Sequence, residues 1–168
     1  KSVLNPQACK DELGRLRVAA ASTVGDAGFD RSQALIDAGV DLVVIDTPPG
    51  PSLYQQQALR LAHFVLVVIH GDPASYATLP AMESVLNKYC TGRPGFFGSA
   101  YLLNNLPSGS PLARDVVRVV RSDLGARLVP TVIHQDESVK EALAFDQLVL
   151  QYAPHSEATR DLSQAAAW

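Results

Sequence analysis

The sequence has few cysteines and no long hydrophobic run, and each shortage excludes a class of protein. Its 168 residues include two cysteines, Cys9 and Cys90, which lie far apart and match no CxxC or zinc-binding spacing. We therefore expect free thiols in a reducing cytoplasm and no disulfide scaffold. The longest apolar run, from Phe64 to Ile69, is far shorter than the ~18 residues that suggest a membrane-spanning helix, and no signal peptide is recognisable at Lys1.

Charged residues are also scarce, at 18% of the chain. Lysine and arginine number 14 against 17 aspartate and glutamate, a net charge of −3, and they form no basic stripe. Because proteins held on nucleic acid depend on such basic surfaces, we expect no nucleic-acid binding. Hydrophobic residues make up 47%, enough to bury a core, and the length is typical of one domain, so we predict a single domain over residues 1–168.

Short aliphatic runs alternate with longer amphipathic stretches, a pattern typical of a parallel sheet with crossover helices. The runs are continuously apolar, as strands covered by helices on both faces require. The sequence therefore predicts an α/β fold, a three-layer doubly wound and mostly parallel sheet. The expected strands are Arg17–Ala21, Leu42–Ile45, Phe64–Ile69, Ala100–Leu103 and Leu128–Ile133.

The stretches between these strands carry helix start and stop signals. In the best defined of these helices, Ser110 precedes Pro111 at the start and Gly125 follows Leu124 at the end. Its expected apolar side consists of Leu112, Val116, Val119 and Val120. A further helix either breaks or begins at Pro80. The expected helices are Ser32–Ala38, Ser52–Leu61, Ala74–Tyr89, Ser110–Leu124, Ser138–Phe145 and His155–Ala167, with Leu148–Tyr152 extended and Gly25–Gly28 a loop.

Asp46 stands at the carboxyl end of the strand expected at Leu42–Ile45, before Thr47-Pro48-Pro49-Gly50. Ligands of parallel sheets bind at this edge. A carboxylate there can hold Mg²⁺ beside a triphosphate, and the rigid turn can point a backbone N–H group at a terminal phosphate oxygen. The competing interpretation is an aspartate that caps the next helix.

The segment from Asp41 to Gly50 resembles the second nucleotide motif of the ParA/MinD-type ATPases, the deviant-Walker branch of the P-loop fold. Leu102-Leu103-Asn104-Asn105 is similar to the segment whose asparagine reads the adenine edge in that family. The stretch from Thr131 to Ser138 and the helices after it resemble the family's base-covering loop and closing elements. The resemblance spans nearly the whole chain from Asp41 onward.

Within that superfamily the chain resembles the BcsQ (YhjQ) proteins of cellulose biosynthesis, through Ile133-His134-Gln135-Asp136-Glu137 and the final Ala166-Ala167-Trp168. The resemblance implies ATP and Mg²⁺ as cofactors and a homodimer around the nucleotide. It also implies other cellulose synthase subunits as partners and a cytoplasmic protein recruited to the inner membrane only through them. The implied site residues are Asp46 for catalysis and metal binding, and Asp46, Pro48, Pro49, Gly50, Asn104, Ile133, His134 and Gln135 for the nucleotide.

The family's glycine-rich loop, of the type KGGxGKST, occurs nowhere in these 168 residues. Its backbone N–H groups and lysines hold the phosphates. Since the chain does not begin with Met, we expect that this part precedes Lys1 in the full protein. Two hypotheses remain: an ATP-binding, ATPase-like subunit, or a non-catalytic interaction module with a decayed ATPase fold.

Two other groups of polar residues are weaker candidates. The four histidines, at positions 63, 70, 134 and 155, have no HExxH-like spacing, and His134 alone is of interest because its matched position lies beside the base. Its alternative is a partly exposed loop histidine. Asp72 follows the strand ending near His70, but its place before Pro73 is more typical of a helix cap.

Overall fold

The computed structural model describes residues 10–13, 15–48, 50 and 52–168. The chain is an α/β protein with parallel strands, and it divides into two compact units, residues 1–61 and 62–168. The single domain expected over residues 1–168 stays a prediction.

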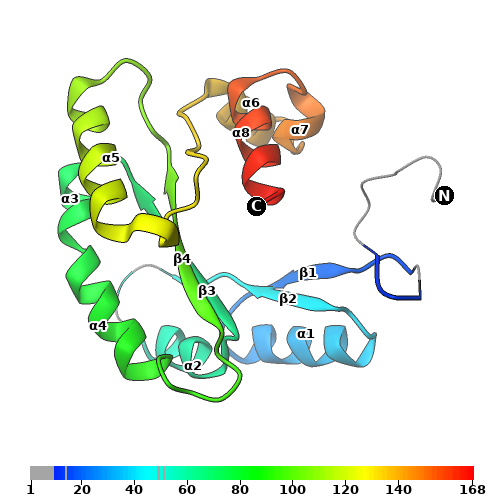
Figure 1. The fold of residues 1–168 in the computed structure, drawn as a ribbon. Helices are drawn as coiled ribbons and strands as arrows, with labels where there is room; N and C mark the ends of the chain where they lie inside the picture. Colours follow the sequence, from blue (N-terminus) through cyan, green and yellow to red (C-terminus); the bar gives the residue numbers. More distant parts are fainter. Residues whose placement is uncertain (1–9, 14, 49, 51) are drawn as a thin grey trace. The chain divides into compact units, whose positions relative to one another are not determined.

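The first unit contains one parallel strand pair and two helices, β1 (Ala19–Ser22), α1 (Asp26–Asp37), β2 (Leu42–Ile45) and α2 (Leu53–Leu61) (Figure 1). β1 and β2 pair in parallel, with Ala19 opposite Leu42 and Ser22 opposite Ile45. The expected strand at β2 and helix at α2 are confirmed. β1 begins two residues later than the Arg17–Ala21 segment that the apolar pattern predicted.

The start of α1 corrects the loop predicted at Gly25–Gly28. Gly25 has a φ of 87°, which glycine adopts readily, and the helix begins at the next residue. Gly28 lies inside the first turn, where an added Cβ would lie 2.0 Å from the carbonyl oxygen of Thr23. A pattern of apolar residues does not reveal where α1 begins. Glycine is needed at position 28 because the backbone of Thr23 lies too close for a side chain, and that contact leaves no apolar pattern in the sequence.

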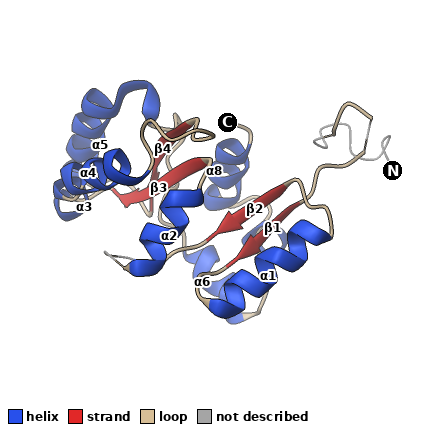
Figure 2. Ribbon diagram, turned by 90° about the horizontal axis from the view of Figure 1, so that it is seen from below, coloured by secondary structure: helices blue, strands red, loops and turns tan. Residues whose placement is uncertain are grey.

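The second unit is built around another parallel pair, β3 (Phe64–His70) and β4 (Gly98–Asn104). Phe64 lies opposite Gly98, and His70 lies opposite Asn104. Both strands lie where the sequence predicts them. The helices are α3 (Pro73–Ala77), α4 (Leu79–Tyr89), α5 (Pro111–Leu124), α6 (Glu137–Ala144), α7 (Val149–Tyr152) and α8 (Glu157–Ala166), and Figure 2 shows α3, α4 and α5 on one side of the strand pair.

The helices of this unit begin at the expected signals. Pro80 falls in the first turn of α4, after a break between α3 and α4. The Ser110 hydroxyl accepts a hydrogen bond from the backbone N–H of Ala113, and Gly125 ends α5. The buried face of α5 consists of Ala113, Val116, Val120 and Leu124, whereas Leu112 and Val119, expected on the apolar side, are exposed.

Two expectations for the chain after α5 are wrong. Residues 128–133 form no continuous strand: isolated parallel bridges join Tyr101 to Leu128 and Leu106 to His134, because Pro130 lacks the N–H group that a ladder needs. Residues 149–152 form the short helix α7, not an extended stretch. Val149 is buried and the backbone N–H groups of Tyr152 and Ala153 donate four residues back, to Leu148 and Val149.

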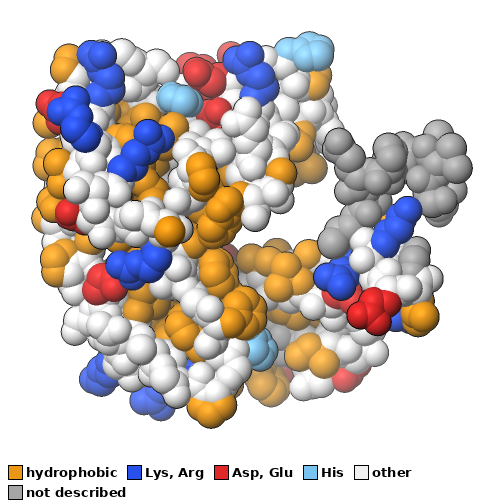
Figure 3. Space-filling model, viewed as in Figure 1, with side chains coloured by type: hydrophobic (Ala, Val, Ile, Leu, Met, Phe, Trp, Pro, Cys, Tyr) orange, Lys and Arg blue, Asp and Glu red, His pale blue; other side chains and the backbone are white. Residues whose placement is uncertain are grey.

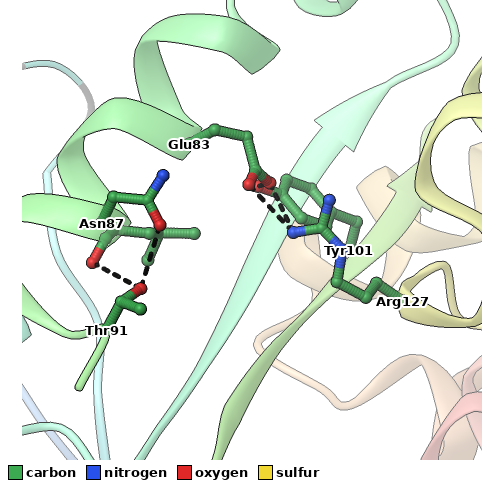
Figure 4. Close-up of polar contacts among 6 residues, drawn as sticks. Glu83, Asn87, Thr91, Tyr101 and Arg127 are labelled. Atoms are coloured by element: carbon green, nitrogen blue, oxygen red, sulfur yellow. Dashed lines mark hydrogen bonds and ion pairs between the residues drawn. The ribbon is translucent and has the colours of Figure 1, made fainter. Parts of the chain in front are cut away.

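Tyr101 is fully buried in the core of this unit and joins three elements (Figure 4). Its hydroxyl donates a hydrogen bond to the Glu83 carboxylate on α4. Arg127, in the 3-10 turn Gly125–Arg127, donates to the same carboxylate at 2.7 and 3.0 Å, and its guanidinium lies 5.6 Å from the Tyr101 ring centroid. Burial and the bond to Glu83 raise the pKa of the Tyr101 hydroxyl.

Many apolar side chains reach the surface, as the hydrophobic areas in Figure 3 illustrate. On β3, Phe64, Leu66 and Val68 are 41–53% exposed, and among the described residues this strand pairs with β4 alone. In the described part of the first unit, Leu59 is the one hydrophobic residue counted as buried core. No helix among the described residues is long and apolar enough to span a membrane.

Candidate nucleotide-binding site

The carboxyl end of β4 carries the first group of predicted site residues. Asn104 ends the strand half-buried, and Asn105 adopts a left-handed conformation with a φ of 55°, which asparagine tolerates better than most residues. The chain therefore turns sharply after Asn104. Leu106 follows and is buried against Gly71, where an added Cβ would lie 2.2 Å from its Cδ1 atom.

Residues 133–135 lie directly beside this turn. The backbone N–H of Ile133 donates to the Leu103 carbonyl at 2.8 Å, and the N–H of Gln135 donates to the Leu106 carbonyl at 2.9 Å. The N–H of Leu106 returns a bond of 3.0 Å to the Ile133 carbonyl. The structure thus brings together Asn104 and Ile133–Gln135, four of the residues predicted around the adenine.

His134 is held by the last helix. Its backbone N–H and its Nδ1 atom each lie 2.9 Å from the same oxygen, Oδ2 of Asp161 on α8. Glu157, one turn earlier on α8, places Oε1 3.7 Å from Nδ1. The ring is 28% exposed, so it remains reachable from solvent.

Asp136 fixes the end of the same loop. It caps α6 by accepting from the Ser138 backbone N–H at 2.9 Å, and it accepts from the Ala158 N–H on α8 at 3.1 Å. These hydrogen bonds, led by that from the Ser138 hydroxyl, lower the pKa of the Asp136 carboxyl to about 2. The loop is therefore anchored to both α6 and α8.

The second group of predicted residues belongs to the first unit. Asp46 follows β2, is exposed, and donates its backbone N–H to the Ser22 carbonyl at 3.1 Å. Pro48 and Gly50 are also exposed, and Gly50 has a φ of 85°. Pro49 lies outside the described residues. An exposed strand-end carboxylate can bind Mg²⁺ together with waters and substrate phosphates, which is how proteins usually hold this ion.

The described residues contain no cluster of three or more His, Cys, Asp or Glu side chains that could hold a metal by themselves. The roles of Asp46 in metal binding and catalysis stay predictions.

Asp72 caps the N-terminus of α3, as its place before Pro73 suggested. Its Oδ1 atom accepts from the Ser75 backbone N–H at 2.9 Å at the start of α3, and the hydrogen bonds from Ser75 lower the pKa of its carboxyl. Beside it, a shallow hollow of about 350 Å³ is lined by Val68, Ile69, His70, Ala74, Ser75 and Thr78. None of these lining residues is among those predicted to bind nucleotide.

Sequence reasoning missed Asp161, and it gave Asp136 no role. Glu157 and Asp161 are four residues apart in a predicted helix, a spacing that places both carboxylates on one helix face. That signal was present, but only the tertiary structure shows that this face meets His134.

A family model, that of the cellulose biosynthesis protein BcsQ, matches residues 12–168. The chain belongs to the BcsQ family. This agrees with the resemblance carried by the residues around His134.

Solved structures similar to this BcsQ-family chain include two ATPases and a synthase. The cell division ATPase MinD of Pyrococcus furiosus superimposes with a TM-score of 0.60 and 21% identity, over 82% of this chain and 54% of that one. Cobyrinic acid a,c-diamide synthase from Mycobacterium smegmatis, with bound ATP analog and magnesium, superimposes with a TM-score of 0.63 and 18% identity, over 83% of this chain and 52% of that one. A ParA family ATPase from Chlorobium tepidum superimposes with a TM-score of 0.60 and 19% identity, over 100% of this chain and 69% of that one. These similarities confirm the predicted α/β P-loop fold of the ParA/MinD type.

Part of the chain is also similar to inosine-5′-monophosphate dehydrogenases. That of Rhizobium tropici is 64% identical over 80 residues, which cover 45% of this chain and 16% of the dehydrogenase. The chain spans between 10% and 18% of the length of the dehydrogenases it matches. Only 11 residues lie before the family match at residues 12–168, so most of the dehydrogenase-like stretch falls within it.

Proposed function

We propose that the chain is the ATP-binding part of a ParA/MinD-like regulatory subunit that serves a bacterial cellulose synthase complex. The observation that carries the proposal is the set of backbone hydrogen bonds that joins Leu103 and Leu106, on either side of Asn104 and Asn105, to Ile133 and Gln135 at the end of β4. Family membership and the P-loop ATPase fold support it. In this proposal Asn104 and Ile133–Gln135 surround the adenine.

Asp46 supports Mg²⁺ in this proposal, and Pro48, Pro49 and Gly50 lie near the terminal phosphate. A related fold with bound ATP analog and magnesium supports these cofactors for the fold. Hydrolysis requires a positioned water and neutralisation of the transferred phosphoryl group. The sequence contains no KGGxGKST loop to supply that charge, so we propose nucleotide binding, not turnover, for the residues of this chain.

The dehydrogenase similarity supports no second function. The stretch covers only 16% of that enzyme, so the activity of the whole enzyme is not carried over to this chain. Function has to be argued from a site, and the contacts described above favour the nucleotide.

Calorimetric titration of the protein with ATP, with and without Mg²⁺, tests the proposal. Asn104→Ala should weaken ATP binding about tenfold in both conditions, a loss of about 1.4 kcal/mol. Asp46→Ala should weaken it only when Mg²⁺ is present. Asp30→Ala, which removes an exposed carboxylate on α1, is the matched control and should change neither value.

Absence of ATP binding would contradict the proposal and favour the non-catalytic interaction module. Equal weakening by Asp46→Ala with and without Mg²⁺ would remove the metal role of Asp46 but leave the base site in place. The two groups of residues are thus tested separately.

The proposal includes a homodimer formed around the nucleotide, cellulose synthase subunits as partners, and recruitment from the cytoplasm to the inner membrane through them. Light scattering should show a shift from monomer to dimer on addition of Mg-ATP. A protein that stays monomeric in both conditions would contradict the dimer.

A further inference from the structure

Asp161 uses one oxygen to bind both the backbone and the ring of His134. Oδ2 lies 2.9 Å from the His134 backbone N and 2.9 Å from Nδ1. The Asp161 side chain is only 13% exposed, so water competes weakly for this contact. The aspartate therefore fixes both the position of the loop and the orientation of the ring.

The contact also sets which ring nitrogen carries the proton. An ionised carboxylate only accepts hydrogen bonds, so Nδ1 must donate and hold the hydrogen. In a neutral imidazole the other nitrogen, Nε2, then presents a lone pair. No described residue makes a hydrogen bond to Nε2, and the ring is partly open to solvent.

The backbone N–H groups of residues 133–135 are all engaged within the protein. Ile133 donates to the Leu103 carbonyl, His134 to Asp161, and Gln135 to the Leu106 carbonyl. Nε2 of His134 is therefore the ring atom of this loop that can accept a hydrogen bond from a base. The 6-amino group of adenine is a donor, whereas the 6-oxo group of hypoxanthine or guanine is an acceptor and would face a lone pair.

We propose that Asp161 is a positioning residue that presents His134 Nε2 as an acceptor and so makes the site prefer 6-aminopurines over 6-oxopurines. The inference rests on the proposed nucleotide function, which it deepens by assigning the base preference to one pair of side chains. Asp161 itself does not touch the nucleotide in this account.

Nitrogen-15 NMR of the imidazole tests the orientation without any nucleotide. At about pH 9, above the usual titration range of histidine, His134 should show a protonated Nδ1 and an unprotonated Nε2. Asp161→Ala should remove this preference, while Glu157→Gln, which changes the other carboxylate near the ring, should retain it. A protonated Nε2 in the unmodified protein would overturn the inference.

Calorimetry with ADP and IDP, which differ at the 6-position of the purine, tests the consequence. The unmodified protein should bind ADP about five- to tenfold more tightly than IDP, the ratio expected for one well-placed hydrogen bond. His134→Leu and Asp161→Ala should both bring the ratio close to one, whereas Glu157→Gln should leave it unchanged.

The two variants separate ring chemistry from loop anchoring. His134→Leu keeps the backbone hydrogen bond to Asp161. Loss of the preference for ADP over IDP in this variant therefore isolates the role of the ring. Equal binding of ADP and IDP by the unmodified protein would overturn the inference alone. Failure to bind either nucleotide would overturn the proposed function, and the purine preference with it.

Discussion

Gly71 and Leu106 approach so closely that no side chain fits between them. A Cβ atom added to Gly71 would lie 2.2 Å from Cδ1 of Leu106 and 4.0 Å from the Ala113 Cβ. Leu106 is 8% exposed and has little room to move. The residue after β3 thus lies against the turn after β4, which carries the proposed base site.

Replacing Gly71 by alanine should therefore lower the free energy of unfolding by about 1–3 kcal/mol, the usual cost of overpacking. Denaturant unfolding monitored by circular dichroism measures this loss. Leu106→Ala in the same background should recover part of it, because the smaller side chain removes the clash. Strict additivity of the two substitutions would show that the residues do not interact.

Removal of the Tyr101 hydroxyl should destabilise the second unit. Tyr101→Phe breaks a partly buried bond to Glu83, and we expect the free energy of unfolding to fall by about 1–2 kcal/mol. Tyr76→Phe is the control, since the Tyr76 hydroxyl donates to Asp123 at an exposed site, 2.7 Å away. If Tyr76→Phe lowered the free energy of unfolding as much as Tyr101→Phe does, burial of the hydrogen bond would not explain the effect at Tyr101.

Asp136 should make stability depend on pH in the acid range. Its pKa is lowered to about 2 in the folded protein, from an ordinary value of 3.8, so the unfolded chain binds the proton more readily. The stabilisation is complete above about pH 4–5 and is lost as the pH falls toward 2.

Melting temperatures measured between about pH 6 and 2 test this dependence. Asp136→Asn should melt lower at about pH 6 and lose less stability on acidification than the unmodified protein. Asp115→Asn, which removes an exposed carboxylate paired with Arg118, serves as the control for charge alone. Parallel curves for Asp136→Asn and the unmodified protein would refute the prediction.

Gly28→Ala should disrupt the first unit more than a substitution that causes only backbone strain. The new Cβ would lie 2.0 Å from the Thr23 carbonyl oxygen, a backbone atom that cannot move without shifting the loop. We expect a loss of about 3 kcal/mol or more. Gly39→Ala, with a φ of 77° and open space around the Cβ, should cost only about 1–2 kcal/mol.

Hydrogen exchange of the amides in β1 and β2 measures the difference between these two variants. Faster exchange in Gly28→Ala than in Gly39→Ala is the expected result. The reverse order would show that backbone strain, not the close approach of α1 to the preceding loop, dominates in this unit.

Local signals in the sequence were sufficient for β2, β3, β4 and α5, because continuous apolar runs and the Ser110-Pro111 and Gly125 caps depend on neighbouring residues alone. Pro130 was itself a local signal against the expected last strand, because its missing N–H group can be read from the sequence, and the apolar pattern was wrongly given more weight. The four-residue helix α7 could not be read in this way, because the burial of Val149 depends on tertiary packing.

The sequence by itself determined the fold class, the family and the identity of Asn104 and His134 as candidate ligands of a base, since motif residues keep their order and spacing along the chain. Only the tertiary structure decided that Asp161 holds His134, that Gly71 closes on Leu106, and that the N–H groups of residues 133–135 are all engaged within the protein. These relationships join residues distant in sequence, and their hydrogen bonds and close contacts depend on how helices and strands pack, which no local pattern records.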